Sequence, residues 1–532
     1  MRFHVLGVGS IGTLVAHHLR LAQPKADICL LFRTAAIFRK QKYLRDQPVL
    51  PRPGPELKVS RAGGETTVSS GYDVGITNHL KLPGLMAAVA AGQVAGVDND
   101  GPIDSLIVCT KAPYTAGAID SLKHRISSSS VIALLQNGMG VYDELCDKFW
   151  PDANDRPQFL LGTTTHGVTP STPGQVVHVS RPGQGAVKWG IVPDPRGFDV
   201  ETWLWGREVG GLPTLTPPDS PTSPLPLPPQ GKGLDNLYET LEALLSMTAL
   251  SPSLLPMPHL YHQLLLKLAV NAVVNPLTAV LGGGYLPNGA IHRTGPGHRL
   301  INQVTEETSQ VLTTYLHALA GGDTPAQPDV VRQFSTEGLL QIIHEVIGST
   351  KANTSSMAMD VKYGRETEVK YINGFLVSLG ERLHVPTPAS RMLIEMVKFK
   401  AEVGGLNGVV YPGVREHIHQ AEKQSVEERQ LGLEQRRIGL AERDMLLKEV
   451  AAREEMRAHR LLKRRAKAAK VEAERLAGRL DPGVLDLSAA EGSGSSESSA
   501  SASASESSAS EQGVSGQAGA SSGTSRGSDA EK

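Results

Sequence analysis

The feature that most constrains this chain is a glycine motif close to its N-terminus. The motif, GVGSIG, follows the strand-like run Arg2–Leu6 and precedes Thr13–Leu21, which has the pattern of a helix. A strand, a tight glycine turn and a helix in this order are the context of a dinucleotide-binding fingerprint. The first glycine allows the turn, the second lets the backbone approach a pyrophosphate, and the third lets the helix pack close to the strand. The N-terminus of the helix would offer unpaired N–H groups and a positive dipole to the phosphates.

We therefore predict that a dinucleotide contacts Gly7, Val8, Gly9, Ser10, Ile11 and Gly12. A glycine-rich turn without a ligand is the alternative. The next apolar run, Ile28–Phe32, ends in Arg33. Proteins that bind NAD usually carry an acid at this place to hold the ribose hydroxyls, whereas an arginine suits a 2′-phosphate. Arg33 therefore favours NADP as the cofactor, against the alternative of an ordinary surface arginine.

Short β-like runs alternate with helical stretches from residue 1 to about residue 257. The runs are Phe3–Val8, Ile28–Phe32, Leu106–Cys109 and Val131–Leu135. This alternation is typical of βαβ units around a parallel sheet. We predict an α/β fold in which residues 1–257 form an N-terminal Rossmann-type domain with a doubly wound sheet.

Two polar loops follow strands of this predicted sheet. Lys111 comes directly after the run Leu106–Cys109, and Asn137 lies in the segment QNGMG after Val131–Leu135. In open α/β sheets the ligands lie at the carboxyl ends of the strands. Lys111 and Asn137 are therefore candidates for contact with a cofactor and a substrate, against the alternative that each is an ordinary loop residue.

Residues 258–412 have a mostly helical pattern, without the alternation of a strand. We predict an all-α C-terminal domain here. After a long apolar helix that begins near residue 259, we expect helices over 298–320, 328–348, 366–383 and 389–404.

Three further segments depart from the composition of a compact domain. Residues 212–232 are so rich in proline that we predict an extended, solvated insertion, with a docking site for a proline-recognition domain as the alternative. Residues 413–480 are dense in helix-forming charged residues, and we predict a long charged helix. Its leucines at seven-residue spacing leave open a short coiled coil that joins copies of the chain into a homo-oligomer. Residues 481–532, dominated by Ser, Ala, Gly and Glu, are predicted to be disordered.

The composition excludes several classes of protein. The net charge is −1, from 53 basic and 54 acidic side chains, which gives no overall attraction to nucleic acid or to an anionic membrane. Three unpaired cysteines argue against a disulfide framework and against a cysteine-rich zinc site, so we expect no metal. We expect no apolar run of the ~20 residues that cross a bilayer, and no leader sequence. These expectations indicate a soluble cytoplasmic protein, with a mitochondrial location without an evident leader as the alternative.

A polar stripe interrupts the most apolar segment of the chain. Lys267, Asn271 and Asn275 are spaced four residues apart, so they lie on one face of a helix. Polar side chains in a buried helix are costly unless each finds a partner. A bound polar substrate would supply such partners. A hydrogen-bond network between helices, or a lysine that reaches solvent, would also explain the stripe.

Motifs of one known family occur in order along the chain. They are the glycine fingerprint, TK at 110–111, QNGMG at 136–140, GTTTHG at 162–167, KLAVNAVVNPLTA at 267–279, SSM at 355–357, T-E followed by YINGF at 367–375, and VPTP at 385–388. In these motifs the chain resembles the ketopantoate reductases (2-dehydropantoate 2-reductases), over about residues 1–405 apart from the Pro-rich stretches. The resemblance implies an enzyme that reduces 2-dehydropantoate to (R)-pantoate with NADPH, in the pantothenate route to coenzyme A.

The resemblance also implies roles for single residues. Lys267 resembles the general acid, and Glu368 resembles the acid placed near this lysine and the nicotinamide, so that it serves both catalysis and cofactor binding. Lys111 resembles the lysine of the same cleft. The implied substrate-binding residues are Asn137, which is shared with the cofactor, Asn271, Asn275, Ser356 and Asn288, the last with a spacing shifted by extra glycines.

The implied chemistry agrees with first principles. When a hydride reaches a ketone carbon, charge builds on the oxygen, and a nearby ammonium group stabilises that charge and then donates a proton. Partial burial of Lys267 would lower its pKa toward neutrality and so suit it to this task.

Two other functions stay open, a related dehydrogenase for another small 2-keto acid and a non-catalytic Rossmann-scaffold paralogue with a binding or assembly role. The joint presence of Lys267, Ser356 and Glu368 argues against the scaffold.

Overall fold

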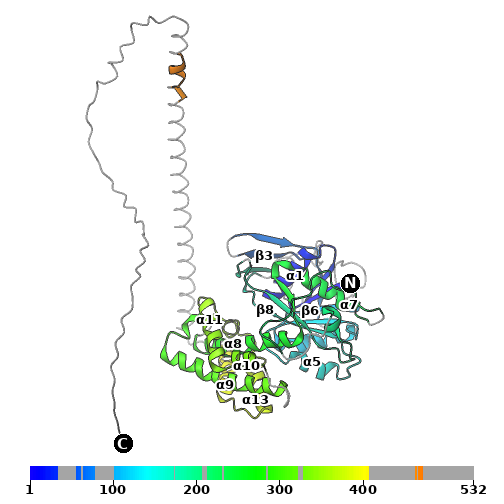
Figure 1. The fold of residues 1–532 in the computed structure, drawn as a ribbon, viewed down its shortest axis with the longest axis vertical. Helices are drawn as coiled ribbons and strands as arrows, with labels where there is room; N and C mark the ends of the chain where they lie inside the picture. The colour runs from blue at the N-terminus through cyan, green and yellow to red at the C-terminus, as the bar shows by residue number, and fades with distance from the viewer. Residues whose placement is uncertain are drawn as a thin grey trace, which may run out of the picture. The chain divides into compact units, whose positions relative to one another are not determined.

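The structure, a computed structural model, describes most of the first 405 residues and a short piece near residue 465. The described residues are 1–33, 55–61, 64–77, 101–172, 174–181, 183–206, 213–230, 233–282, 286–320, 327–405, 462–463 and 465–470. The chain divides into two compact units, Met1–Tyr411 and Pro412–Lys532. The first unit contains an α/β region, drawn in blue to green, followed by a helical region drawn in green to yellow (Figure 1).

An eight-stranded sheet forms the centre of the α/β region. Its strands are β1 (Arg2–Leu6), β2 (Asp27–Phe32), β5 (Asp73–Ile76), β6 (Ser105–Val108), β7 (Val131–Leu135), β8 (Gln158–Thr164), β11 (Val187–Ile191) and β12 (Pro252–Leu254). They are ordered β12-β11-β8-β7-β6-β1-β2-β5. The six strands from β8 to β5 are parallel, and β11 is antiparallel to β8.

The strand order confirms the predicted doubly wound sheet. The chain passes from β1 to β2 on one side of the sheet and later returns to β6 on the other side of β1. The order of strands therefore reverses at β1, and a crevice forms at the carboxyl ends of β1 and β6, where such folds bind their ligands. All residues of β6 and β7 are buried, because helices cover both faces of a parallel sheet.

Helices cover the two faces of the sheet. They are α1 (Ser10–Ala22), α4 (Ala112–Asp120), α5 (Val141–Phe149), α6 (Val200–Trp205) and α7 (Asp235–Leu245), with short turns η3 (Lys123–Arg125) and η4 (Thr248–Leu250). Leu14 of α1 and Leu244 of α7 belong to one apolar core, whereas Ile119 and Leu145, of α4 and α5, belong to another. Because the two cores lie on opposite faces, the sheet is buried on both sides.

A second, smaller sheet packs against α1. Its strands are β3 (Leu57–Arg61), β4 (Thr66–Ser69), β9 (Val168–Thr172) and β10 (Gln175–His178), in the order β4-β3-β10-β9. His17 of α1 is buried at this contact and bonds the hydroxyls of Ser69 and Thr67 at 2.8 and 2.9 Å. Burial lowers the pKa of His17 to about 4, so this imidazole is neutral at pH 7.

The remainder of the first unit is all-α, as predicted. Its helices are α8 (Met257–Gly282), α9 (Gly295–Ala320), α10 (Pro328–Gln333), α11 (Thr336–Ser349), α12 (Ser356–Lys362), α13 (Asn373–Arg382) and α14 (Pro388–Gly405), with the short turn η5 (Asn288–Ala290). The helix predicted over 328–348 is two helices, because the Ser335 hydroxyl caps α11 by accepting from the Gly338 N–H at 3.1 Å. The helix predicted over 366–383 begins only at Asn373.

The long helix α8 is the centre of this helical region and packs against α9, α11, α12 and α14. Of the described helices, it is the one long and apolar enough by composition to cross a membrane, with 72% of the apolar window buried inside the protein. The expectation that no apolar run reaches this length was therefore wrong. The apolar residues are explained by the burial of α8 on nearly all sides by other helices.

A proline lies inside α8 without ending it. Pro276 has no N–H group and cannot donate to the carbonyl of Ala272, one turn earlier. The side-chain amide of Asn373, at the start of α13, donates to this carbonyl instead, with an N–O distance of 2.9 Å. Asn373 is fully buried. A side chain from another helix thus replaces the missing hydrogen bond and lets α8 continue past Asn275.

The Pro-rich insertion predicted over 212–232 is extended, but it is not simply solvated. Its described part, 213–230, contains no helix or strand. Leu225 is only 4% exposed and belongs to the core of the α/β region. The indole N–H groups of Trp203 and Trp205 donate to backbone carbonyls of the insertion, each over 3.0 Å. One buried leucine and two indole donors therefore fix the segment to the domain, which the proline content alone could not show.

The predicted charged helix and disordered tail lie almost wholly outside the described residues. Residues 462–463 and 465–470 are described and are helical and exposed. The coiled coil and the disorder of residues 481–532 stay predictions. Among the described residues, no three His, Cys, Asp or Glu side chains are grouped in a way that could hold a metal ion.

Candidate active site

The glycine turn after β1 has the geometry that its sequence predicts. Gly7 has a φ of +91°, and a Cβ there would lie 2.5 Å from the backbone nitrogen of Thr110. A Cβ at Gly12 would lie 2.1 Å from the Gly7 carbonyl oxygen, so only glycine lets α1 approach the turn. A Cβ at Gly9 would meet no described atom within 4 Å, and this residue faces open space at the start of α1. That space is where a pyrophosphate would lie.

The other residues of the turn divide by environment. The side chains of Val8 and Ile11 pack against the core of the α/β region, so a dinucleotide would meet them through their backbone. Ser10 is the first residue of α1, and no described side chain caps this helix. The N–H groups of its first turn therefore remain available to phosphate oxygens.

Arg33 directly follows β2 and is exposed. Its guanidinium carbon lies 5.7 Å from the centre of the Tyr114 ring, which belongs to α4. Arg33 and Tyr114 thus lie side by side at the carboxyl end of the sheet, beside the glycine turn. A cation at this position is where the 2′-phosphate of NADP would be held.

Glu368 connects the two loops that follow β6 and β7. One of its carboxylate oxygens accepts from the backbone N–H of Ala112 at 3.3 Å, and the other accepts from the side-chain amide of Asn137 at 3.1 Å. Glu368 is only 5% exposed, and this burial raises its pKa. The acid comes from the helical region, whereas both donors come from the α/β region, so these bonds cross from one region to the other.

Lys267 of α8 lies at the same boundary between the α/β region and the helical region. Its ammonium group donates to the carbonyl of Thr164, at the end of β8, with an N–O distance of 2.8 Å. Burial lowers the pKa of Lys267 from 10.5 to about 8, and the nearby charge of Glu368 acts in the opposite direction. The geometry therefore brings together Lys267, Glu368 and Asn137, which the sequence predicted as members of one site. An ammonium group with a pKa near 8 is suited to give up a proton at neutral pH.

Lys111 has a partner that the sequence did not predict. Its ammonium group forms an ion pair with Asp360 of α12, and the guanidinium of Arg365 lies 3.2 Å from the same carboxylate oxygen. Asp360 is only 1% exposed, and its burial raises its pKa against the effect of the two cations. Lys111 lies at the predicted edge of the sheet and links the two regions beside Glu368, whose own pKa it lowers.

The two asparagines of the α8 stripe lie one and two turns beyond Lys267. Asn275 is 7% exposed, and Asn271 is partly buried. No described residue makes a hydrogen bond with either side-chain amide. Amides that lie on the same face as the lysine and lack protein partners are available to a polar ligand.

Ser356 and Asn288 are held less directly. Ser356 is exposed at the first position of α12, while the preceding Ser355 is buried and caps the helix by accepting from the Ala358 N–H at 3.1 Å. Asn288 donates from its amide to the Thr350 hydroxyl at 3.0 Å, and its amide oxygen is buried without a described partner. Asn288 thus contacts the loop between α11 and α12, and neither residue is seen to contact Lys267 among the described residues. Their predicted contact with a substrate stays a prediction.

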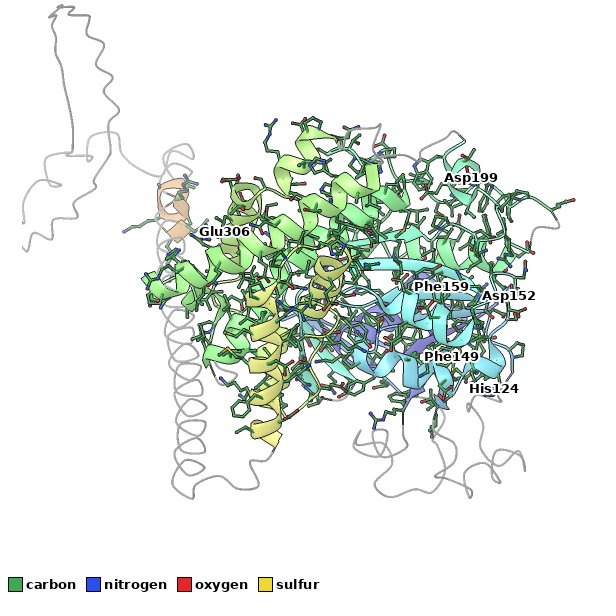
Figure 2. The ribbon with its side chains drawn as sticks, turned by 90° about the horizontal axis from the view of Figure 1, so that it is seen from below. His124, Phe149, Asp152, Phe159, Asp199 and Glu306 are labelled. Atoms are coloured by element: carbon green, nitrogen blue, oxygen red, sulfur yellow. The ribbon has the colours of Figure 1, made fainter. Side chains whose placement is uncertain are left out.

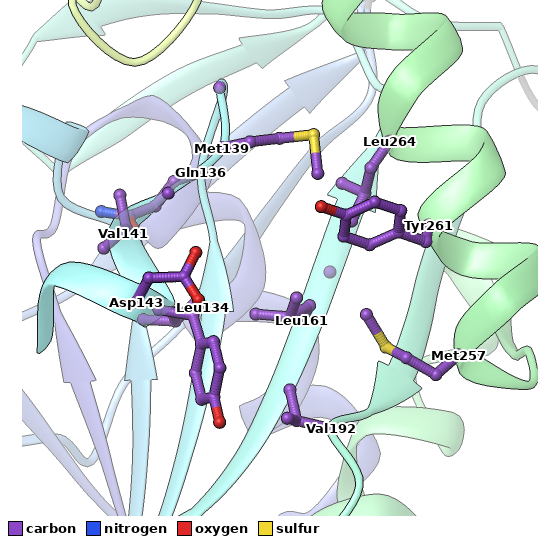
Figure 3. Close-up of a pocket in the computed structure, with 14 residues that line it drawn as sticks. Leu134, Gln136, Met139, Val141, Asp143, Leu161, Val192, Met257, Tyr261 and Leu264 are labelled. Carbon is purple, nitrogen blue, oxygen red and sulfur yellow. The ribbon is translucent and has the colours of Figure 1, made fainter. Parts of the chain in front are cut away.

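A cavity of about 270 Å³ lies beside the first turns of α8 and against the loop that carries Asn137 (Figure 3). Met257, Tyr261 and Leu264 of α8 line one side of it, and the loop that carries Asn137 lines another. Leu264 precedes Lys267 by three residues, so it lies on the same helix face and about 4.5 Å along the axis. The cavity is mostly apolar, with the hydroxyl of Tyr261 and the carboxylate of Asp143 at its margin, as Figure 3 shows.

Sequence reasoning missed the residues that support the site from a distance. Asp360 lies four residues after Ser356 in a short helix that was not predicted, and the Thr164 carbonyl is a backbone group without a signal of its own. Thr164 lies in the GTTTHG motif, but the motif gave no sign that its backbone carbonyl would accept a hydrogen bond from Lys267. Only the fold shows that these groups meet Lys111 and Lys267.

Two family models match the chain in agreement with this arrangement. The model described as ketopantoate reductase PanE/ApbA matches residues 3–194, and that of the C-terminal part of the same proteins matches residues 259–401. The chain belongs to the ketopantoate reductase family. As a member of this family it is an oxidoreductase, and the resemblance inferred from its motifs is confirmed.

Curated relatives and solved structures agree with the assignment. A probable 2-dehydropantoate 2-reductase of Schizosaccharomyces pombe is 24% identical over 76% of this chain and 97% of its own length. A 2-dehydropantoate 2-reductase of Shigella flexneri is 28% identical over 56% of this chain and 74% of its own. A PanE/ApbA family ketopantoate reductase from Ralstonia eutropha superposes with a TM-score of 0.50 at 18% identity, over 76% of this chain and all of its own. A D-mandelate dehydrogenase in complex with NADH and anilino(oxo)acetate superposes with a TM-score of 0.51 at 18% identity, over 76% of this chain and 99% of its own. The two structures show the shared fold.

Proposed function

We propose that this chain reduces 2-dehydropantoate to (R)-pantoate with NADPH, a step in the formation of pantothenate and coenzyme A. The observation that carries the proposal is the position of Lys267, whose pKa is lowered by burial to about 8 and whose ammonium group lies near Glu368 at the carboxyl edge of the sheet. The relatives named for this reaction support the choice of substrate.

The residues at the crevice fit a nicotinamide dinucleotide. The turn at Gly7–Gly12 leaves space and backbone N–H groups for a pyrophosphate, and Arg33 offers a cation to a 2′-phosphate. When bound, the cofactor supplies the hydride, and the protein positions it against the carbonyl group. Glu368 holds the Asn137 side chain at the end of β7, where its amide can contact both the cofactor and the substrate.

The protein itself supplies the proton. Lys267 stabilises the negative charge that develops on the keto oxygen and then donates a proton to it. The Thr164 carbonyl accepts one ammonium hydrogen and so directs the others into the gap. Glu368 holds the Asn137 amide and raises the pKa of Lys267, so that the lysine is protonated before each turnover. The amides of Asn271 and Asn275, which have no hydrogen-bond partner within the described part of the chain, are positioned to bind the hydroxyl and carboxylate groups of the substrate.

The test is NADPH oxidation by the full chain with 2-dehydropantoate, compared with Lys267→Ala. General acid catalysis contributes about 10²- to 10⁴-fold, so we expect kcat to fall at least about 100-fold. Lys188→Ala is the matched control, because Lys188 is also a partly buried lysine whose pKa is lowered by burial, and its ammonium donates to Gln263 at 2.9 Å. Wild type and Lys267→Ala that are equally inactive while NADPH still binds would instead indicate the non-catalytic scaffold.

The cavity along the first turns of α8, whose lining includes Leu264 one turn before Lys267, favours a second candidate, a related dehydrogenase for a 2-keto acid with a larger apolar tail. Its walls are apolar residues of α8 and of the loop that carries Asn137. Phenylglyoxylate, an aromatic 2-keto acid, is the probe. If it is turned over faster than 2-dehydropantoate, and if Leu264→Phe abolishes this preference by filling the cavity, the second candidate replaces the first.

A further inference from the structure

A second cavity, of about 330 Å³, lies in the α/β region between the last turns of α1, the strands β3 and β4, and the turn η4. Small-molecule sites in proteins measure about 300–1,000 Å³, so this cavity can hold a small ligand. None of its described lining residues belongs to α4 or α5, which cover the other face of the main sheet and end near His124 and Phe149 (Figure 2). We call this cavity the α1 hollow. Its polar lining comes from His18, Arg61, Glu65, Thr67, Ser246 and Thr248.

The α1 hollow is separate from the crevice that would hold the dinucleotide. Helix α1 begins at the glycine turn, at the carboxyl edge of the main sheet, and ends shortly before β2 begins at the amino edge. His18 follows Ser10 by eight residues, which is about 12 Å along the helix axis. Neither the glycine turn nor Lys267 is among the described residues that line the α1 hollow.

An arginine lies on the inner side of the smaller sheet at the α1 hollow. Side chains alternate along a strand, so Leu57, Val59 and Arg61 of β3 share one face. Leu57 and Val59 are buried in the core that includes α1, which shows that this face is the inner one. Arg61 is partly buried and pairs in register with His178 of β10. Because its guanidinium forms no hydrogen bond or ion pair with any residue that the structure describes, it is available to an anion.

His18 is a second polar group at the α1 hollow that lacks a partner. It is 8% exposed, and neither of its ring nitrogens makes a hydrogen bond with a described residue, whereas the adjacent His17 binds two hydroxyls. Burial, and after it the nearby His17, His178 and Arg61, lowers the pKa of His18 to about 3, so this imidazole is neutral at pH 7. A neutral imidazole has one N–H to donate, and its basic surroundings favour an anion as the acceptor.

The rest of the lining indicates which kind of anion fits the α1 hollow. The Thr248 hydroxyl makes no hydrogen bond with a described residue and can donate to a ligand oxygen. Leu21, Val59 and Met247 supply an apolar wall. Glu65 is the one acid among the described lining residues, and its charge disfavours a second negative charge on the ligand. A singly charged anion with an apolar body therefore fits better than a dianion.

We propose that the α1 hollow binds a small monocarboxylic acid with an apolar body, as a second ligand site apart from the candidate active site. The Arg61 guanidinium pairs with both carboxylate oxygens, in the bidentate geometry that arginine favours. The His18 N–H and the Thr248 hydroxyl donate further hydrogen bonds to the carboxylate. The apolar body packs against Leu21 and Met247. Such a ligand supplies Arg61 and His18 with the partners that they lack among the described residues.

The test titrates 3-methylbutanoate into the full chain at pH 7 by isothermal calorimetry. We expect saturable binding to a single site. Arg61→Ala removes the guanidinium, so the dissociation constant should rise at least about 10-fold. Lys58→Ala is the matched control, because Lys58 lies on the same strand but on its outer face. This control should bind 3-methylbutanoate as tightly as wild type does.

Two further measurements locate the ligand. Thr248→Trp places a large side chain at an exposed position of the α1 hollow without changing its charge, and it should abolish binding. In NMR spectra of protein labelled at histidine, the His18 signal, identified by its loss in His18→Gln, should shift on addition of 3-methylbutanoate. The signal of His298, which is exposed on α9, should not shift. Circular dichroism spectra that match wild type show that each variant is folded.

Three outcomes would overturn the proposal. If 3-methylbutanoate does not bind to wild type, the site does not exist. If folded Arg61→Ala binds it as tightly as wild type does, the acid binds elsewhere, for example in the crevice beside Lys267. If inorganic sulfate binds more tightly than 3-methylbutanoate and loses affinity in Arg61→Ala, the α1 hollow takes a dianion instead of a monocarboxylate.

Discussion

Lys267 experiences two opposing electrostatic effects, and their balance sets its chemistry. Burial removes water from the ammonium group and lowers its pKa, whereas the nearby carboxylate of Glu368 stabilises the charge and raises it. Burial is the larger effect, so the pKa is about 8 instead of 10.5. At pH 7 the lysine is therefore still mostly protonated, but it releases its proton far more readily than a lysine in water.

The pKa of Lys267 predicts how the rate depends on pH. Keto reduction needs the protonated lysine, so kcat/KM should be constant below about pH 8 and fall as the pH rises through the pKa. The reverse oxidation needs the neutral lysine and should rise over the same range. In Glu368→Gln the carboxylate that raises the pKa of the lysine is absent, and the fall in keto reduction should move to lower pH. A shift of this variant to higher pH would contradict the proposed coupling.

Arg33 predicts the choice between the two nicotinamide cofactors. In Arg33→Ala the cation that would pair with the 2′-phosphate is absent, so KM for NADPH should rise at least about 10-fold while KM for NADH changes little. Lys25→Ala, which removes an exposed cation just after α1, should change neither value. An equal rise in KM for NADPH and for NADH in Arg33→Ala would contradict a 2′-phosphate site at this residue.

At the scale of elements, strands were easier to predict than the boundaries of helices. The runs Ile28–Phe32 and Val131–Leu135 lie within β2 and β7, because a parallel strand buried on both faces must be apolar throughout. The helix predicted over 366–383 begins only at Asn373. The preceding residues form turns closed by the Glu368 carbonyl, which accepts from the N–H groups of Tyr371 and Ile372 at 3.0 and 3.1 Å. The helical pattern thus failed at the segment that positions an active-site acid.

The candidate site shows the same limit. Periodicity alone placed Lys267, Asn271 and Asn275 on one helix face, because residues four apart must share a face. The roles of Glu368 and Ser356 came from a family resemblance instead. Asp360 was missed because a lone aspartate in a short helix has no signal in the sequence, and its importance arises only when Lys111 lies beside it.

The proline in α8 predicts a dependence of that helix on Asn373. Asn373→Ala leaves the buried Ala272 carbonyl without a donor, and we expect it to lower the free energy of unfolding by about 1–3 kcal/mol in urea denaturation. Pro276→Ala restores an N–H that can donate to this carbonyl. The double variant should therefore be more stable than Asn373→Ala alone. If the two effects simply add, the Asn373 amide does not substitute for the missing helix bond.

At the scale of the whole first unit, a small set of polar bonds joins the α/β and helical regions. Besides Glu368 and Lys267, the N–H of Met139 donates to the Tyr371 carbonyl at 2.9 Å, and Lys111 is paired with Asp360. A Cβ at Gly138 would lie 2.5 Å from the same Tyr371 carbonyl, so glycine is required for this close approach. These contacts surround the candidate site and fix the width of the gap.

The ion pair between Lys111 and Asp360 predicts a loss of stability when it is broken. Asp360→Asn leaves the cations of Lys111 and Arg365 beside a neutral buried group, and we expect the melting temperature to fall by several degrees. Asp329→Asn is the control, because Asp329 forms an exposed ion pair with Arg332 at 2.9 Å and exposed pairs contribute little. An equal fall in the melting temperature of both variants would mean that the buried ion pair stabilises the contact between the two regions no more than an exposed ion pair stabilises the protein.

The bonds of Lys267 and Glu368 cross from one region to the other, and this has a consequence for turnover. If the two regions swing apart to admit or release a dinucleotide, Lys267 loses Thr164, becomes hydrated, and its affinity for a proton returns toward that of a free lysine in water. The lysine would then take up a proton from solvent in the open form, and its pKa would return to about 8 only when the two regions close. Opening and closing of the two regions would in this way determine when Lys267 donates its proton, and no separate residue would be needed to detect a bound ligand.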